Sequence, residues 1–165
     1  MQSSNGGTTW DSPIKVNQDS TTSAQWQPAM SVKPSGNKLF IGWYSREDDL
    51  VNNEFINVYG VVANLPVTGG SSFAGKFRIS TESFPPVFTG TQITPGAYDP
   101  VYPPSHPSIC PDFDGTFANH MGDYDTAVSD NSYFYYTWGD NRNLTQGTLL
   151  LRKQADIRFV RVTWP

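Results

Sequence analysis

Short apolar runs, each ended by turn residues, constrain this chain to β-structure. Residues 155–162 alternate strictly between apolar and polar side chains, and residues 38–44 form a continuous β-branched and aromatic run. No stretch long enough for a stable helix shows a 3.6-residue period. The 14 glycines and 13 prolines among 165 residues, of which only 16% are charged, also suit strands and turns better than helices. We therefore predict an all-β protein.

The runs predict a leading strand, then a set of four strands, then a set of three. The leading strand covers residues 12–16, the set of four covers residues 28–32, 38–44, 54–63 and 76–79, and the set of three covers residues 121–128, 133–138 and 155–162. Between the two sets, residues 84–119 hold eight of the 13 prolines. Such a segment cannot supply the donors of a β-ladder, so we expect an elaborate loop that is either packed on the scaffold by its aromatic residues or flexible.

Charge and hydropathy exclude several classes of partner. The net charge of -4 and the sequence pI of about 4.9 argue against a nucleic-acid surface or an anionic-membrane surface. No run approaches the ~20 apolar residues that span a bilayer, and no signal peptide follows Met1. Cys110 is the only cysteine, so no internal disulfide is possible, and an incidental thiol is the simpler interpretation than a reactive one.

The N-terminus carries a turn motif at residues 3–10. Asn and Gly tolerate positive φ, and an Asn side chain can bond backbone amides two residues further on, so the stretch predicts a hairpin turn. We expect a strand to begin at Thr9 and Trp10, with the indole ring under the turn. The residues that define the motif are Ser3, Asn5, Gly7, Thr9 and Trp10. An ordinary hairpin turn without family meaning is the alternative.

The second half of the chain matches the first. A strand, a turn and a run that ends in Trp43 and then Arg46 correspond to a strand, a turn and a run that ends in Trp138 and then Arg142. The two tryptophans stand 95 positions apart, a period lengthened by the proline-rich insertion. Sets of four strands that repeat in this way are typical of the blades of a β-propeller.

Taken together, these motifs resemble the sialidase-like, Asp-box (bacterial neuraminidase repeat) β-propeller superfamily. The resemblance rests on residues 3–10, with Asn5 in place of the usual Asp, on residues 28–46, on residues 121–124 and on residues 138–142. It implies the C-terminal part of a secreted bacterial protein. The organisation that it implies is a leading outer strand with the Asp-box at 1–16, a complete blade at 26–80, the insertion at 84–119 and a three-stranded partial blade at 120–165.

The strand count makes two blades' worth of sequence, whereas the resembling propellers close a ring of six. Repeats of this kind bury their faces only against neighbours. Either three chains form a six-bladed ring, with the leading strand of one chain completing the last blade of another or of itself, or the chain is a piece of a longer polypeptide. Both alternatives stay open, and the resemblance implies an extracellular location.

The catalytic set of the resembling sialidases is incomplete here. Those enzymes use an arginine triad, a tyrosine nucleophile with a glutamate, and an aspartic acid. Arg78 only partly matches their Arg-Ile-Pro motif and is expected to be an ordinary surface residue, and no tyrosine partner is recognisable for Glu47, Glu54 or Glu82. We therefore expect a non-catalytic binding or scaffold module with a glycan as its ligand. The alternative is an exo-sialidase-like glycoside hydrolase completed by missing sequence or by other subunits.

The candidate ligand-binding residues follow from the repeat and from the resemblance. Arg46 and Arg142 recur after a tryptophan, which favours a salt bridge or a stack on an aromatic ring over anion binding. In resembling propellers the first strand of a blade lines the central channel, which implies that Asp123, Tyr124 and Asp125 face it.

No cofactor is expected, with Ca²⁺ as the alternative. Asp112 and Asp114 resemble the opening of a calcium loop, but the later ligands of an EF-hand are missing, so turn-capping is the better interpretation. His106 and His120 lack the spacing of metal ligands.

Overall fold

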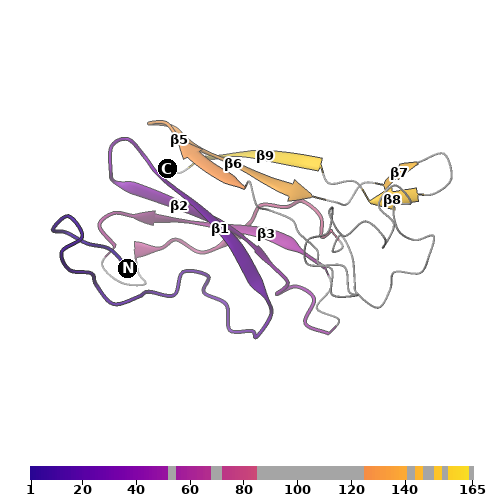
Figure 1. Cartoon of the computed structure of the whole chain (residues 1–165), viewed down its shortest axis with the longest axis horizontal. Helices are drawn as coiled ribbons and strands as arrows, with labels where there is room; N and C mark the ends of the chain where they lie inside the picture. The colour runs from indigo at the N-terminus through magenta and orange to yellow at the C-terminus, as the bar shows by residue number, and fades with distance from the viewer. Residues whose placement is uncertain are drawn as a thin grey trace, which may run out of the picture.

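The computed structural model describes residues 1–51, 55–67, 72–84, 125–140, 144–146, 151–153 and 156–163. These residues form an all-β structure of antiparallel sheets and contain no helix. A four-stranded sheet and a three-stranded sheet lie face to face as two layers, and a separate two-stranded ribbon lies to one side (Figure 1). The described strands form no closed ring. The prediction of the fold class is thus confirmed at the level of all-β antiparallel sheets.

The four-stranded sheet is a meander in which each strand pairs with the next. Its strands are β1 Gln25–Val32, β2 Lys38–Ser45, β3 Asn57–Asn64 and β4 Phe77–Arg78, in the order β1-β2-β3-β4. The set of four predicted from the sequence is therefore present. The predicted start of its third strand is wrong, because residue 55 lies outside any strand and Ile56 instead forms a bridge to Phe84. Phe84 is fully buried, so it belongs to the core and not to the insertion.

Strand β1 starts three residues earlier than the sequence predicted and carries a β-bulge. The register shifts between the pairs Trp26–Tyr44 and Ala29–Gly42, so two residues of β1 face one residue of β2. Gln27, in the bulge, has a φ of 49°, which is uncommon for a residue with a Cβ. The bulge places both Trp26 and Ala29 on the face that meets the other sheet.

The three-stranded sheet is formed by β5 Thr126–Ser129, β6 Tyr133–Asp140 and β9 Asp156–Thr163. The predicted turn at Asp130 is confirmed, because its carboxylate accepts the amides of Ser132 and Tyr133 at 2.6 and 2.7 Å. Burial alternates along β6, and its buried side faces the four-stranded sheet.

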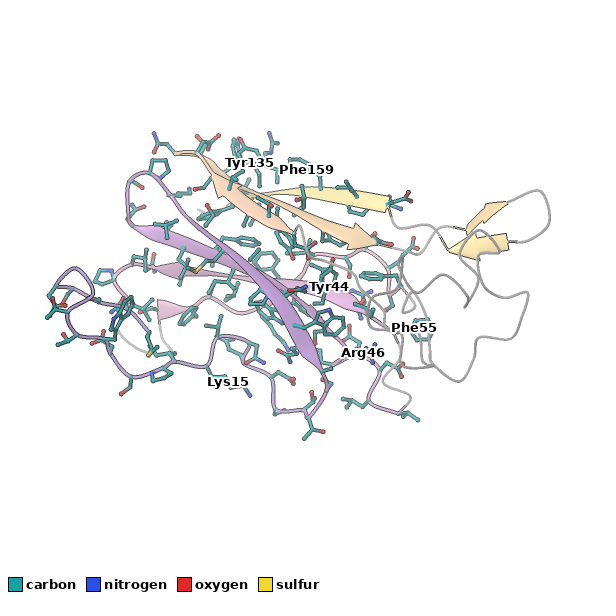
Figure 2. The ribbon with its side chains drawn as sticks, viewed as in Figure 1. Lys15, Tyr44, Arg46, Phe55, Tyr135 and Phe159 are labelled. Atoms are coloured by element: carbon teal, nitrogen blue, oxygen red, sulfur yellow. The ribbon has the colours of Figure 1, made fainter. Side chains whose placement is uncertain are left out.

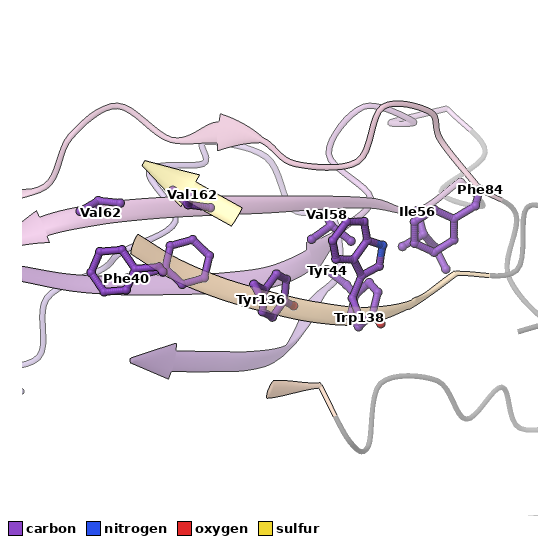
Figure 3. Packing of buried hydrophobic residues seen from close by; sticks show 10 residues of the cluster. Phe40, Tyr44, Ile56, Val58, Val62, Phe84, Tyr136, Trp138 and Val162 are labelled. Atoms are coloured by element: carbon purple, nitrogen blue, oxygen red, sulfur yellow. The ribbon is translucent and has the colours of Figure 1, made fainter. Parts of the chain in front are cut away.

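One aromatic core joins the two sheets. Phe40 stacks on Phe134 at 5.6 Å between ring centroids and lies 5.6 Å from the ring of Tyr136 (Figure 3). Gly42 provides the room for this contact, since a Cβ at this position would lie 2.9 Å from the Tyr136 ring. The buried members of the cluster are Phe40, Tyr44, Ile56, Val58, Val62, Phe84, Phe134, Tyr136, Trp138 and Val162.

The leading strand predicted at residues 12–16 is wrong, and so is the strand start at Thr9 and Trp10. These residues belong to no strand. The segment instead runs along the outer face of the four-stranded sheet (Figure 1). Val16 packs there against a second cluster made by Trp43, Tyr59 and Val61. The predicted alternation of buried and exposed side chains is present at Ile14, Lys15 and Val16. It arises because the segment packs on the face of a sheet, and not because it pairs as a strand within one.

Two short strands were not predicted from the sequence. They are β7 Leu144–Gln146 and β8 Leu151–Lys153, which pair with each other. Each has three residues, which is shorter than the run of about four to eight that a periodicity argument needs.

Candidate functional site

Asp125 lies where the two sheets meet, next to the end of β2. The Tyr44 hydroxyl is within 3.2 Å of Asp125 Oδ1, 3.1 Å of the carbonyl oxygen of Gly139 and 2.8 Å of its amide nitrogen. The same amide nitrogen is 3.3 Å from Asp125 Oδ1. Tyr44 thus connects the four-stranded sheet to both β6 and the residue before β5, and this contact fixes the position of Asp125.

Two buried phenols surround this carboxylate. Burial raises the pKa of the Tyr44 hydroxyl well above its usual value, and the negative charge of Asp125 raises it further. The same two causes, in the same order, raise the pKa of Tyr136. Both phenols therefore keep their protons at neutral pH, which suits donors of hydrogen bonds and not nucleophiles.

Arg46 joins this group through an aromatic stack. Its guanidinium lies over the Trp26 ring at 5.4 Å, and Trp26 stacks on Tyr44 with ring centroids 5.5 Å apart (Figure 2). The stacking role that the repeat favoured for Arg46 is confirmed. The structure therefore links Arg46 and Asp125, two of the residues named from the sequence, through Trp26 and Tyr44, which the sequence did not single out.

Several predicted residues lie outside the part of the chain that the structure describes. These are Asp123, Tyr124, Arg142, the calcium candidates Asp112 and Asp114, and also Cys110, His106 and His120. Within the described residues, no group of three His, Cys, Asp or Glu side chains could hold a metal ion. The same residues contain no helix that is long and apolar enough to cross a membrane.

The Ser3–Trp10 stretch is a turn held by side chains, but it is not the predicted hairpin, because no strand follows it and Asn5 bonds the amide of Thr9 rather than one two residues further on. Asn5 Oδ1 accepts the Ser3 hydroxyl at 2.9 Å and the Thr9 amide at 3.0 Å, while Asn5 Nδ2 donates to Thr9 Oγ1 at 2.8 Å. The Gly7 amide, in a residue with φ of 89°, donates to Ser3 Oγ at 2.8 Å. The Trp10 side chain is 61% exposed, so it does not form a buried base for the turn.

A second polar cluster, which the sequence did not predict, lies beyond the end of β2. Asp48 accepts the Tyr59 hydroxyl at 2.7 and 2.8 Å and the Asn57 amide at 2.8 Å, and the Arg78 guanidinium lies 3.6 Å from it. Arg78 is an exposed residue of the edge strand β4, as expected from the sequence, and its ion pair with Asp48 lies at the surface. Burial, together with the hydrogen bond to Asp48, raises the pKa of Tyr59, so this tyrosine is not poised as a nucleophile.

A hollow of about 630 Å³ separates the N-terminal segment from β1 and β2. Its walls are mainly apolar, and Lys15 is its one charged lining residue. The full lining is Lys15, Val16, Asn17, Gln25, Trp26, Pro28, Met30, Ile41 and Trp43. The hollow is open to solvent on one side, so a ligand or a partner can reach its apolar walls.

The architecture and the site define an all-β protein whose two main antiparallel sheets share one aromatic core. No family model matches the chain, and comparison with curated proteins and with solved structures gives no significant match.

Proposed function

We propose that the chain is a non-catalytic extracellular binding or scaffold module made of sialidase-like propeller blades, with a glycan as its ligand. The observation that carries this proposal is the orientation of the two repeats. Trp43 and Trp138, which match in the repeat, lie on opposite sides relative to the interface: Trp138 is in the core between the sheets, and Trp43 is on the outer face. Blades that follow one another by rotation about an axis have this head-to-tail arrangement, whereas two sheets related by a two-fold axis would bury both tryptophans together.

The contact between the first strands of the two sheets supports the same arrangement. Ser31 Oγ of β1 donates to Ser129 Oγ of β5 at 2.9 Å, and Ser129 Oγ lies 2.8 Å from the carbonyl oxygen of Val32. In a propeller, the first strands of neighbouring blades lie side by side along the central channel. The resemblance predicts that Asp123 and Tyr124 face the same channel, and both lie outside the described residues.

The proposed glycan site is the group of Arg46, Trp26 and Asp125, extended by Asp123 and Tyr124. An aromatic ring offers a flat apolar surface to one face of a sugar, and carboxylate and guanidinium groups bond its hydroxyls. The absence of an activated tyrosine at Tyr44, Tyr59 and Tyr136, the phenols discussed above, favours binding over hydrolysis.

A glycan array and a fluorogenic sialoside test the proposal together. We expect array signal without turnover, and loss of that signal in Arg46→Gln. Lys38→Gln is the matched control, because it removes the same charge at the opposite end of β2, where Lys38 Nζ donates to Asn64 Oδ1 at 2.6 Å. Turnover that falls in Arg46→Gln would establish the hydrolase alternative instead, and a folded protein that gives neither signal would refute both.

A further inference from the structure

Two surfaces of this molecule are apolar and differ in shape. One is the hollow described above, whose walls include Trp26, Met30 and Trp43. The other, here called the ridge, is the outer face of the three-stranded sheet, formed by Tyr133, Tyr135 and Phe159. Figure 2 places Tyr135 and Phe159 on the side of this sheet that faces away from the rest of the molecule.

The ridge is an ordered aromatic surface. Tyr135 stacks on Phe159 with ring centroids 6.1 Å apart, and Tyr133 lies 6.2 Å from Tyr135. Arg161 lies over the Tyr133 ring at 4.4 Å. Phe159 is 61% exposed. Exposed groups of aromatic residues with arginine are characteristic of protein interfaces.

We infer that the ridge of one copy of this chain docks into the hollow of a second copy. The repeat provides the argument. With Trp43 matched to Trp138, the residue matched to Phe40 is Tyr135 and the residue matched to Ile41 is Tyr136. Within one copy, the face of the first sheet that carries Phe40 packs against the face of the second sheet that carries Tyr136 and Trp138.

The contact between copies repeats that packing with the equivalent faces. In the repeat, the face of the second sheet that carries Tyr135 corresponds to the face of the first sheet that carries Phe40. The hollow opens on the face of the first sheet that carries Trp43, which corresponds to the face of the second sheet that carries Trp138. Each molecule therefore has both halves of a sheet-on-sheet contact that it already makes once internally. The N-terminal segment covers only part of the acceptor face and leaves the hollow beside β1 and β2.

The charges at the two surfaces are compatible with this contact. Lys15 is the one charged side chain in the lining of the hollow. On the ridge, the Tyr135 hydroxyl donates to Asp130 at 2.6 Å, which keeps the pKa of that carboxyl below its usual value and thus keeps it ionised. Arg161 is a cation on the same sheet face, but its guanidinium is stacked on Tyr133.

The contact is heterologous, because two different surfaces meet, and this property makes it testable. It rests on the head-to-tail orientation of the repeats proposed above and not on glycan binding. Loss of glycan binding would be seen on the array, whereas failure of this contact would be seen as a monomeric mass. Light scattering on a sizing column should give a mass above the 18.3 kDa of one chain. A concentration-dependent series of masses would indicate an open assembly, and a single sharp mass would indicate a closed one, which the substitutions below distinguish from a symmetric dimer.

Two charge substitutions separate the surfaces. Phe159→Asp on the ridge and Met30→Asp in the hollow change side chains that are 61% and 68% exposed, so both variants should fold. Each alone should be a monomer, and an equal mixture should form a dimer that stops at two chains, because one intact ridge and one intact hollow remain. Val51→Asp, at a 92% exposed residue outside both surfaces, is the control and should assemble like the wild type.

Three results would overturn the inference. Wild-type protein that remains monomeric at its highest soluble concentration would leave the hollow to a small ligand or another partner. Met30→Asp that still associates while Phe159→Asp does not would show a symmetric ridge-to-ridge dimer. A mixture of the two variants that stays monomeric, with wild-type thermal unfolding for each, would show that the two surfaces do not meet.

Discussion

The four-stranded sheet and the three-stranded sheet differ in how many of their faces are covered. Seven of the eight residues of β3 are buried, because the core lies on one side of this strand and the second cluster, of Trp43, Tyr59 and Val61, lies on the other. In β9, burial alternates, and Ile157 and Phe159 are 84% and 61% exposed. The two sheets share one core, and the outer face of the first sheet is covered at β3 but remains exposed at β1, where Met30 is 68% exposed.

If the contact proposed above forms, stability and association depend on different faces of the same sheet. The inner face of β6 holds the two layers together, and the outer face is free to meet something else. Substitutions on the two faces should therefore separate the free energy of unfolding from the strength of self-association.

The largest expected effect is on the inner face. Phe134→Ala removes a fully buried ring that stacks on Phe40, and should lower the free energy of unfolding by about 3–5 kcal/mol. Ile157→Ala, on the exposed outer face of the same sheet, should change it by less than about 0.5 kcal/mol. Urea denaturation at low protein concentration measures both. Equal losses would mean that the outer face is packed in the monomer.

Alkaline pH should weaken the junction between the sheets. Burial, reinforced by Asp125, raises the pKa of Tyr44 and Tyr136 in the folded state, whereas unfolded tyrosines titrate near about 10. Their contribution to stability is therefore complete below about pH 10 and is lost as the pH rises above it, by about 1.4 kcal/mol per pH unit for each tyrosine.

Tyr136→Phe isolates this effect from other groups that titrate in the same range. The free energy of unfolding should fall less steeply between about pH 10 and 12 in this variant than in the wild type. Identical slopes would show that the phenol of Tyr136 ionises as easily in the folded state as in the unfolded state.

Crowding between the sheets can be tested at a glycine. Gly42→Ala places a Cβ 2.9 Å from the buried Tyr136 ring and should cost about 1–3 kcal/mol. Gly75→Ala is the matched control, since no atom lies within 4 Å of its added Cβ. Thermal unfolding measures both variants, and a neutral Gly42→Ala would show that the two layers can move apart without cost.

The smallest effect concerns the N-terminal turn, which lies outside both sheets. Ser3→Ala removes the acceptor of the Gly7 amide and the donor to Asn5, and should cost about 0.5–1.5 kcal/mol locally. Amide exchange at Gly7 and Thr9 should accelerate, while exchange in β2 and β3 should not change. Faster exchange in those strands would mean that the turn stabilises the whole four-stranded sheet.

The fold class and most strands could be predicted from the sequence because burial leaves a period. The continuous run at residues 38–44 predicted a strand buried on both faces, and the alternation at 155–162 predicted a regular strand; β2 and β9 bear these out. At residues 12–16 the same signal failed. Periodicity reports which side chains are buried, and it does not report whether the backbone amides have a neighbouring strand to pair with.

Only the two charged residues of the candidate site could be predicted from the sequence. The repeat predicts Arg46 and the resemblance to propellers predicts Asp125, but Trp26 and Tyr44, which connect them, are paired across β1 and β2. The Asp48–Arg78 pair was missed for a related reason, since its members are 30 residues apart in sequence and meet only through the pairing of β3 with β4.

The bulge in β1 makes this strand sensitive to changes of length. Because two residues of β1 occupy the space of one, Trp26 and Ala29 share a face despite their odd spacing. Deleting Gln27 would leave Trp26 two positions before Ala29, which is the spacing of a regular strand, so Trp26 would stay on the face of Tyr44. Deleting Pro28 as well would make Trp26 and Ala29 adjacent and turn the indole to the opposite face, so a double deletion should be tolerated far less than a single one.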